Sequence, residues 1–190
     1  LRLVRIQQKP FLENVISNED YIYFKRKLNN PAERYWYFVI RFLAATGARI
    51  SELLQIKVEH VSVGFIDLYS KGGKVRRIYI PAKLKNEATV WLAARNQSSG
   101  FIFVNRKGER ITARGVAAQL KKLAVKYRLN AAVVYPHSFR HRFAKNFLDH
   151  FNDISLLADL MGHESIETTR IYLRRTSTEQ QTIVNRVVTW

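Results

Sequence analysis

The sequence contains no cysteine. Disulfide bonds, cysteine-ligated zinc and thiol nucleophiles are therefore excluded, and the composition is compatible with a reducing compartment. The sequence also lacks an apolar run of about 18 residues, a signal peptide and a lipidation motif, which argues against a membrane protein. Neither an internal repeat nor a low-complexity segment is present. These absences predict a cytoplasmic globular protein.

Acidic residues are scarce relative to basic ones. The 190 residues include 32 lysines and arginines against 15 aspartates and glutamates, which gives a net charge of +17. The positive residues recur along the whole chain, and this distribution predicts a polyanionic partner, with nucleic acid favoured over an anionic membrane surface. Hydrophobic residues make up 47% and aromatic residues 12%, so the chain can bury a core, and its length fits one domain.

Hydrophobic periodicity predicts a mainly α-helical protein with a small antiparallel β-sheet. A hairpin is expected over residues 61–81, turning at Gly72 and Gly73, because Ile78 and Ile80 alternate with polar neighbours. A further short strand is expected at 101–104, and residues 1–16 are expected to form a linker or an opening strand. The expected helices cover residues 17–28, 32–46, 50–54, 112–127, 138–149, 154–161, 166–172 and 177–188.

Several short motifs carry residues suited to binding an anion. TGARISE places Arg49 just after a glycine that ends an apolar helix, where the guanidinium needs a carboxylate or a ligand as its partner. HSFRHRF places His137 and Arg140 on one face of a helix, so that both can donate to a single anion. MGHESIETTRIYL places His163 nine residues ahead of Tyr172. Taken alone, each motif is also compatible with an ordinary solvated or locally paired side chain.

In this order, the motifs TGxRxxE, SKGGK, HxxR, GH and a tyrosine nine residues later resemble the catalytic domain of the tyrosine recombinases, also called the phage integrase family. The resemblance runs from about residue 17 to residue 173. It implies the tyrosine recombinase catalytic-domain fold over residues 17–176, preceded by the linker 1–16. The terminal helix, 177–190, would pack either on its own domain or onto a neighbouring protomer.

The resemblance also implies roles for the motif residues. Arg49 and Arg140 would clamp the non-bridging oxygens of a scissile phosphodiester, since guanidinium forks match phosphate geometry. His137 and His163 would donate to the phosphate or move protons. Tyr172 would attack phosphorus and leave a 3′-phosphotyrosine.

The lysine of the glycine turn is the remaining implied catalytic residue. Lys71 would protonate the departing 5′ oxygen. Lys74 stands on the other side of the same turn and is the alternative, although the lysine of the family usually precedes the glycine. Both could instead be solvated lysines that touch the DNA backbone.

The charges around the motifs fit this chemistry. A tyrosine with a pKa of about 10 is ionised to roughly one part in a thousand at neutral pH. Nearby cations are expected to lower the pKa of Tyr172, and a decrease of about two units corresponds to roughly 2.7 kcal/mol. The same cations would stabilise the transition state, so neither a metal nor a nucleotide cofactor is expected.

Two details of the sequence leave other possibilities open. His137 and His141 are four residues apart on a helix, which is one possible metal-binding arrangement, although no third ligand of suitable spacing is evident. The turn DHFND, residues 149–153, lacks the glycine usual in the family, so Asn152 is expected to take any left-handed conformation that the turn requires.

The predicted function is that of a site-specific DNA recombinase, metal- and ATP-independent, that cuts and rejoins strands through Tyr172. Its partners would be double-stranded DNA and further protomers, assembled as a tetramer, with no membrane. The alternatives are a type IB topoisomerase-like strand transferase and a non-catalytic DNA-binding module. Because the family carries amino-terminal DNA-binding domains that are not found here and the first residue is Leu1, we expect a fragment of a longer protein.

Overall fold

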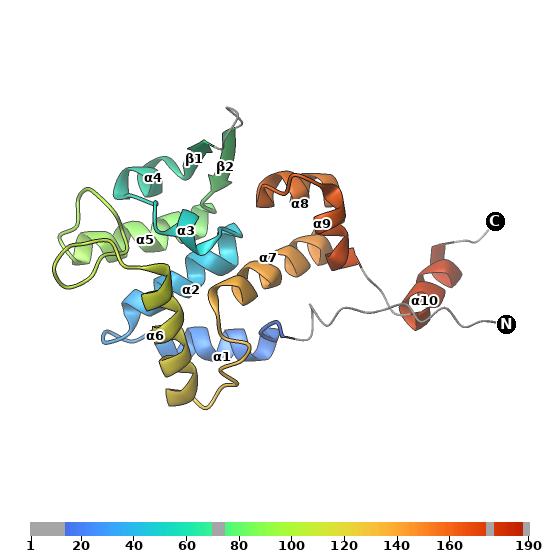
Figure 1. Cartoon of the computed structure of the whole chain (residues 1–190), viewed down its shortest axis with the longest axis horizontal. Coiled ribbons are helices and arrows are strands. Elements are labelled where there is room, and N and C mark those ends of the chain that lie inside the picture. Colours follow the sequence, from blue (N-terminus) through green and yellow to red (C-terminus); the bar gives the residue numbers. More distant parts are fainter. Residues whose placement is uncertain (1–13, 70–74, 174–176, 188–190) are drawn as a thin grey trace.

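The computed structural model describes residues 14–69, 75–173 and 177–187. For residues 177–180 it describes the backbone alone. These parts are mainly helical and include one two-stranded antiparallel sheet, as predicted (Figure 1). The first half contains α1 (Asn18–Leu28), α2 (Arg34–Thr46), α3 (Ile50–Leu53), α4 (Val58–Val63), β1 (Phe65–Tyr69), β2 (Val75–Tyr79) and α5 (Ala82–Ala94). The second half contains α6 (Ala113–Lys126), α7 (Pro136–His150), α8 (Ile154–Met161), α9 (Ile166–Arg170), the 3₁₀ turn η1 (Ile171–Leu173) and α10 (Ser177–Val187).

The amino-terminal helices begin and end at the side chains that the sequence indicates. The Ser17 hydroxyl accepts a hydrogen bond from the Asp20 amide at 3.0 Å and caps α1. α2 starts two residues later than predicted, because the Asn30 side chain accepts from the amides of Ala32 and Glu33 and holds them in a turn. Gly47 ends α2 with a φ of 65°, a left-handed conformation that glycine adopts without strain.

The predicted hairpin is present, but it is shorter than expected. β1 pairs antiparallel with β2, with Ile66 opposite Ile78 on the buried face. Residues 61–63 belong to α4 instead of a strand, and Gly64, with a φ of 91°, ends that helix and starts β1. The expected turn at Gly72 and Gly73 lies outside the described residues.

The central segment differs from the prediction at two places. Residues 82–94 form α5, which the sequence analysis missed because exposed Val90 blurs an otherwise helical spacing of buried residues. Residues 101–104 do not form a regular strand. Phe101 and Val104 make only isolated bridges, to Lys57 and Arg110 respectively.

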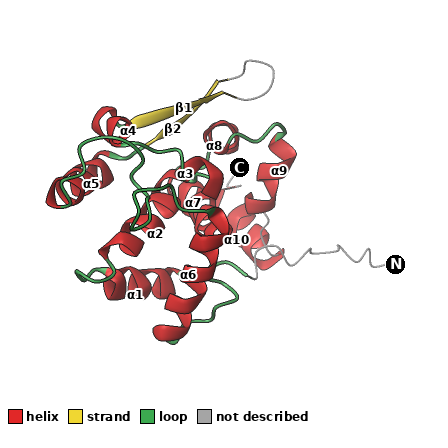
Figure 2. Ribbon diagram, turned by 60° about the vertical axis from the view of Figure 1, so that its left-hand side comes forward, coloured by secondary structure: helices red, strands yellow, loops and turns green. Residues whose placement is uncertain are grey.

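α2 forms the centre of the molecule. It packs along α7 and against α1 and α5 (Figure 2), and its buried apolar residues are Phe38, Val39, Ile40, Phe42 and Leu43. A second, smaller cluster contains Ala144, Leu148, Leu157 and Met161, which join α7 to α8. Tyr172 packs against this second cluster, so the cluster fixes the aromatic ring of the predicted nucleophile relative to α7.

The turn after α7 differs from the expectation for Asn152. Among the described residues, Asn96 and Arg128 are the non-glycine residues with positive φ, and Asn152 is not one of them. The chain instead leaves α7 through Phe151 in an extended conformation, and the Asp153 side chain caps α8 by accepting from the Leu156 amide at 2.8 Å. An extended exit needs no left-handed residue.

The carboxyl-terminal helices largely follow the sequence pattern. The expected helix 166–172 is α9 followed by η1, so Tyr172 lies in a tighter 3₁₀ turn. The expected helix 177–188 is α10. None of the described helices is long and apolar enough to cross a membrane.

Candidate active site

The junction between α2 and α3 positions Arg49. After Gly47 the chain turns sharply, and Arg49 becomes the residue that precedes the first turn of α3. The Glu52 carboxylate accepts from the Arg49 amide at 2.6 Å and from its guanidinium at 2.8 Å. The Arg49 guanidinium also donates to the Gly162 carbonyl at 3.1 Å, while its side chain remains 42% exposed. Arg49 is therefore oriented and still accessible to a ligand.

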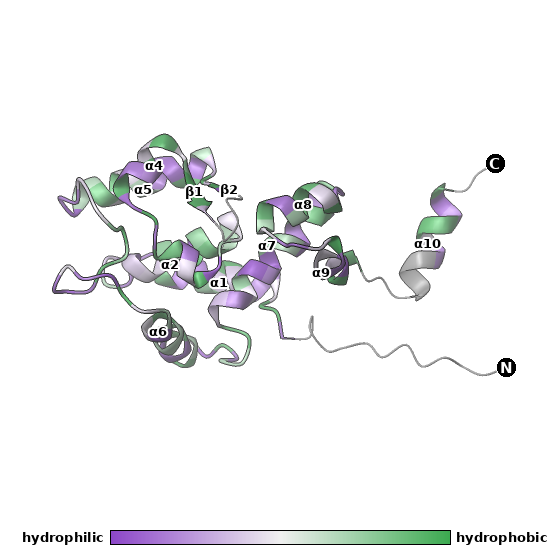
Figure 3. Ribbon diagram, turned by 45° about the horizontal axis from the view of Figure 1, so that its top comes forward, coloured by the Kyte–Doolittle hydropathy of each residue, from purple (hydrophilic) through white to green (hydrophobic). Residues whose placement is uncertain are grey.

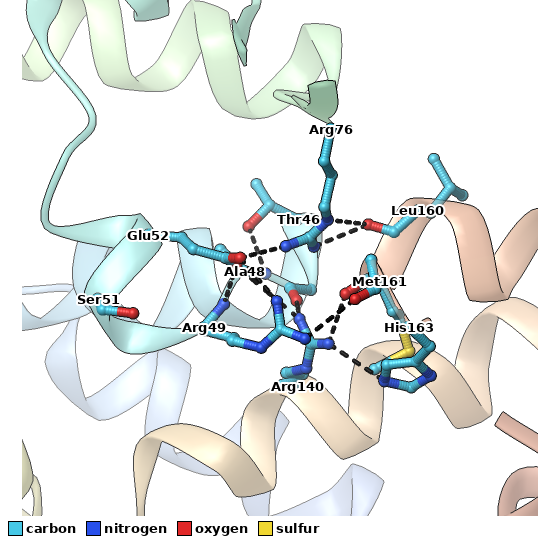
Figure 4. A network of polar contacts seen from close by, with 12 residues as sticks. Thr46, Ala48, Arg49, Ser51, Glu52, Arg76, Arg140, Leu160, Met161 and His163 are labelled. Carbon is cyan, nitrogen blue, oxygen red and sulfur yellow. Dashed lines mark hydrogen bonds and ion pairs between the residues drawn. The ribbon is translucent and has the colours of Figure 1, made fainter. Parts of the chain in front are cut away.

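Glu52 links three arginines that come from distant parts of the chain (Figure 4). Besides Arg49, it forms an ion pair with Arg76 from β2 and lies 4.0 Å from a guanidinium nitrogen of Arg140 on α7. Burial alone would raise the pKa of Glu52, but the hydrogen bond from the Arg49 amide and the charge of Arg76 outweigh it and lower the pKa. Glu52 is thus a carboxylate at neutral pH and offsets part of the positive charge.

Arg140 is the most deeply buried of these arginines, with 1% of the residue exposed. Its guanidinium donates to the Gly47 carbonyl and, at 2.7 Å, to the Met161 carbonyl. Burial, followed by the charges of Arg49 and Arg76, lowers the pKa of Arg140 to about 10. Arg140 therefore remains charged at neutral pH and contributes an oriented cation.

His163 lies directly beside Arg140. The Arg140 guanidinium approaches His163 Nε2 at 3.3 Å, and His163 Nδ1 lies 2.7 Å from the Thr169 hydroxyl. Because arginine can only donate, Nε2 accepts and Nδ1 carries the proton. Burial and the charges of Arg140 and Arg49 lower the pKa of His163 to about 4, so the imidazole is neutral at neutral pH.

Tyr172 contacts α7 through His141, the residue that follows Arg140. Its hydroxyl lies 2.5 Å from His141 Nδ1, and His141 is 4% exposed. The expectation that neighbouring cations lower the pKa of Tyr172 was wrong for the free chain. Burial raises the pKa of Tyr172 to about 12 and outweighs the opposing charge of Arg140.

The remaining predicted residues occupy less defined positions. The imidazole of His137 is exposed and contacts the His141 ring edge-on, with centroids 4.6 Å apart. Within the described part of the chain, no three histidine, aspartate or glutamate side chains come together as metal ligands, so His137 and His141 gain no third partner there. Lys71 and its alternative Lys74 lie outside the described residues.

Two site residues were not predicted from the sequence. Arg76 donates to the Leu160 carbonyl at 3.0 and 2.8 Å, in addition to its ion pair with Glu52. The available signal was the period of two in β2, which places Arg76 on the same face as buried Ile78. The sequence pattern suggests His141 only as a possible metal ligand, although this residue follows Arg140 directly.

Gly162 provides a test of how Arg76 holds this site together. A Cβ at Gly162, whose φ is 62°, would lie 2.3 Å from Arg76 Cδ. We expect Gly162→Ala to lose about 1–2 kcal/mol of unfolding free energy through the left-handed backbone alone. A further loss of roughly 1–3 kcal/mol is expected because Arg76 must leave Leu160 and Glu52. Denaturant unfolding measures the sum.

Gly108 offers a matched control for this substitution. Its φ is 80°, but no atom lies within 4 Å of the Cβ position. Gly108→Ala should therefore show the backbone effect alone. In an Arg76→Ala background, Gly162→Ala should cost only the backbone effect, since the clash is absent there. Equal losses for the two glycine substitutions would contradict the proposed role of Arg76.

The geometry brings four of the predicted residues into one site. Arg49, Arg140 and His163 are connected through hydrogen bonds, and Tyr172 is attached to the neighbouring position of α7. Oriented guanidinium groups suit a phosphoryl oxygen, because they stabilise negative charge without rearrangement. The Tyr172 hydroxyl lies near enough for the charge of Arg140 to act on its pKa.

Comparisons with known proteins agree with the motifs. Over 154 residues the chain is 34% identical to tyrosine recombinase XerA of Pyrococcus furiosus, which covers 78% of this chain and 53% of that protein. Tyrosine recombinase XerD of Oceanobacillus iheyensis is 32% identical over 143 residues, covering 70% of this chain and 48% of that protein. The chain thus spans about half the length of these relatives.

Solved structures show the same fold. A crystal structure of XerA recombinase superposes with a TM-score of 0.75 at 21% identity, over 93% of this chain and 65% of that one. At these identities the likeness concerns the fold, which is that of a tyrosine recombinase catalytic domain. The profile of the phage integrase family matches residues 16–179. The chain therefore belongs to the phage integrase family.

Proposed function

We propose that the chain is the catalytic part of a site-specific DNA recombinase. In this proposal it cuts and rejoins DNA strands through a covalent 3′-phosphotyrosine at Tyr172 and requires neither metal nor ATP. The observation that carries the proposal is the succession of Arg140 and His141 on α7. Arg140 holds its buried guanidinium beside His163, and His141 contacts the hydroxyl of Tyr172. A phosphate bound by the arginines would therefore lie close to the tyrosine.

Each residue has a role in this proposal. Arg49 and Arg140 bind the non-bridging oxygens of the scissile phosphate and stabilise the charge of the transition state. His163 donates to the phosphate through Nε2 once that nitrogen is released from Arg140 and takes up a proton, which the negative charge of the phosphate favours. His137 approaches from the exposed side. Lys71, with Lys74 as the alternative, protonates the departing 5′ oxygen. The phosphotyrosine retains the bond energy, so religation needs no nucleotide.

The proposed substrate is double-stranded DNA. The net charge of +17 favours a polyanion, and a phosphodiester is the group that paired guanidiniums fit best. Members of the same fold family include a Tn1549 transposon integrase solved in complex with transposon right end DNA. We further propose that the protein acts in the cytoplasm and that four protomers assemble on DNA.

The experiment that tests this function maps covalent cleavage. The chain is incubated with DNA fragments that flank its gene, each carrying a nick that traps the cleaved strand, and adducts are located by sequencing. We expect adducts at defined positions, joined through the 3′ phosphate, with chelator present and ATP absent. The absence of any adduct would instead favour a non-catalytic DNA-binding module.

A type IB topoisomerase-like activity is the alternative with the same chemistry. It would form the same adduct but act on one duplex without pairing two sites. Substrates with two labelled duplexes separate the two possibilities, because only a recombinase produces strands that join one duplex to the other.

The terminal segment, residues 177–190, is proposed to dock on a neighbouring protomer. α10 lies at one end of the molecule beyond α9, and its apolar positions lie along the second half of the helix (Figure 3). Val184 and Val187 remain 49% and 53% exposed, beside a hollow of about 750 Å³ that they share with Leu173 and Ile154. Val188 and Trp190 lie outside the described residues.

Truncation distinguishes docking in trans from packing in cis. Deleting residues 177–190 should leave a folded domain with a melting temperature close to that of the full chain, because α10 covers little of the core. Cleavage on a two-site DNA should fall and should no longer rise cooperatively with protein concentration. A strongly lowered melting temperature would favour packing in cis.

A further inference from the structure

His141 lies within hydrogen-bonding distance of the reacting oxygen of the proposed nucleophile. Its Nδ1 lies 2.5 Å from the Tyr172 hydroxyl, and the two rings are 5.6 Å apart between centroids. His137, the histidine that the sequence suggested as a proton carrier on this helix, contacts the His141 ring. We propose that His141 accepts the proton of Tyr172 when the tyrosine attacks phosphorus. This inference rests on the proposed phosphotyrosine mechanism.

The site makes a proton acceptor necessary. Tyr172 is half-buried, and in the free chain burial raises its pKa to about 12, so the phenolate is scarce at neutral pH. Attack without an acceptor would depend on this small ionised fraction. A group within hydrogen-bonding distance removes this dependence, because the proton leaves as the new bond forms.

His141 is available as that acceptor. Burial and the charges of His137 and Arg140 lower the pKa of His141 to about 4, so the imidazole is unprotonated at neutral pH. Between a phenol and a neutral imidazole, the phenol is the stronger acid and the ring nitrogen the better acceptor, so Tyr172 donates to Nδ1. An anionic phosphate among these cations offsets their charge and makes His141 more basic at the moment of attack.

The step is balanced in atoms and electrons. The O–H bond of Tyr172 breaks and an N–H bond forms at His141 Nδ1, while the phenolic oxygen forms its bond to phosphorus. The bond from phosphorus to the 5′ oxygen breaks, and this oxygen takes the electron pair and a proton from the proposed acid, Lys71. On religation His141 returns the proton to Tyr172.

Several charged or titratable groups influence the pair and so bear on its pH dependence. His137 and Arg140 belong to α7 itself, and His163 approaches from the turn after α8. Tyr135, which precedes α7, and Arg140 act on Tyr172. Because all of these groups remain in a variant at position 141, a change in the pH profile can be assigned to His141.

Two substitutions at His141 separate proton transfer from positioning. His141→Asn keeps a hydrogen-bonding group near the place of Nδ1 but cannot accept a proton, whereas His141→Phe fills the space without a hydrogen bond. Single-turnover adduct formation is measured on a nicked DNA between pH 6 and 10, together with DNA affinity and the melting temperature. His150→Asn, at the exposed end of the same helix, is the control.

We expect both variants to cleave more slowly by about 10²–10⁴-fold, with DNA affinity within a few-fold of wild type. Their rates should rise about tenfold per pH unit, because attack then requires prior ionisation of Tyr172. Wild-type and His150→Asn rates should depend much less on pH. If His141→Asn cleaves at the wild-type rate, the hydrogen bond to Tyr172 matters and proton transfer does not. If both variants cleave faster than wild type, the contact with His141 restrains Tyr172. Either result overturns the inference.

A fluorinated tyrosine at position 172 gives a second and independent test. Its phenol ionises near neutral pH, so it needs no acceptor. It should restore His141→Asn to within about tenfold of the wild-type rate, whereas a lost positioning contact would leave the defect in place. In the wild-type background, if no His141 variant folds, the same substitution should change the cleavage rate by less than about tenfold, because His141 already accepts the proton. An increase of several orders of magnitude would show that ionisation of Tyr172 limits the wild type, and it would overturn the inference. An absence of adducts in the wild type would instead refute the proposed function.

Discussion

Replacement of Tyr172 by phenylalanine is expected to abolish the covalent protein–DNA adduct while leaving DNA affinity within a few-fold of wild type. The aromatic ring stays packed against the second hydrophobic cluster, so the substitution removes the hydroxyl and its contact with His141. The loss of one hydrogen bond should lower the unfolding free energy by about 1 kcal/mol. Denaturing gels of trapped cleavage reactions measure the adduct.

Tyr135→Phe is the matched control for this prediction. Tyr135 influences Tyr172 electrostatically, and its hydroxyl donates to the Asn14 carbonyl at 3.2 Å, away from the arginines. This variant should form the adduct at a rate close to wild type. An adduct formed by Tyr172→Phe would show that another residue is the nucleophile.

Arg140→Ala is expected to impair both folding and cleavage. The substitution leaves the Gly47 and Met161 carbonyls without their donor in a buried region and removes a cation beside Glu52. We expect a loss of roughly 2–5 kcal/mol of unfolding free energy. Cleavage should fall by at least about 10²–10³-fold, the effect of one lost transition-state donor. Denaturant unfolding and single-turnover cleavage measure the two effects separately.

Arg49→Ala should affect cleavage without a comparable loss of stability. The Arg49 side chain is 42% exposed. Its removal should therefore cost less unfolding free energy than the loss of buried Arg140. A cleavage defect of similar size in a domain of near-normal stability would assign the effect to chemistry. Near-normal cleavage by both arginine variants would contradict the proposed phosphate clamp.

The sequence predicted the helices whose ends are determined by local chemistry. Ser17 caps α1 and Gly47 ends α2 through interactions within a few residues, and the sequence specifies such interactions directly. Where tertiary contacts decide, the prediction failed. α5 packs against α2 and α4, and Phe101 forms an isolated bridge with Lys57, a residue distant in the sequence, instead of joining a regular strand.

The candidate site shows a similar division. Arg49, Arg140, His163 and Tyr172 were predicted because their motifs have a fixed order, and the structure places them together. Which groups neutralise and orient them depends on contacts across the fold. Arg76 reaches Leu160 across 84 positions of sequence, a contact that no local pattern could specify. The pKa of Tyr172 likewise depends on burial, which the motif spacing does not reveal.

The arginines of the site are held mainly by main-chain oxygens. The acceptors are the carbonyl groups of Gly47, Leu160, Met161 and Gly162. A point mutation changes a side chain but cannot delete a carbonyl group. The partly buried side chain of Leu160 can therefore change during evolution while its carbonyl acceptor is inherited unchanged. The contacts of Arg76 should thus tolerate substitution better at Leu160 than at Glu52, whose carboxylate is a side chain.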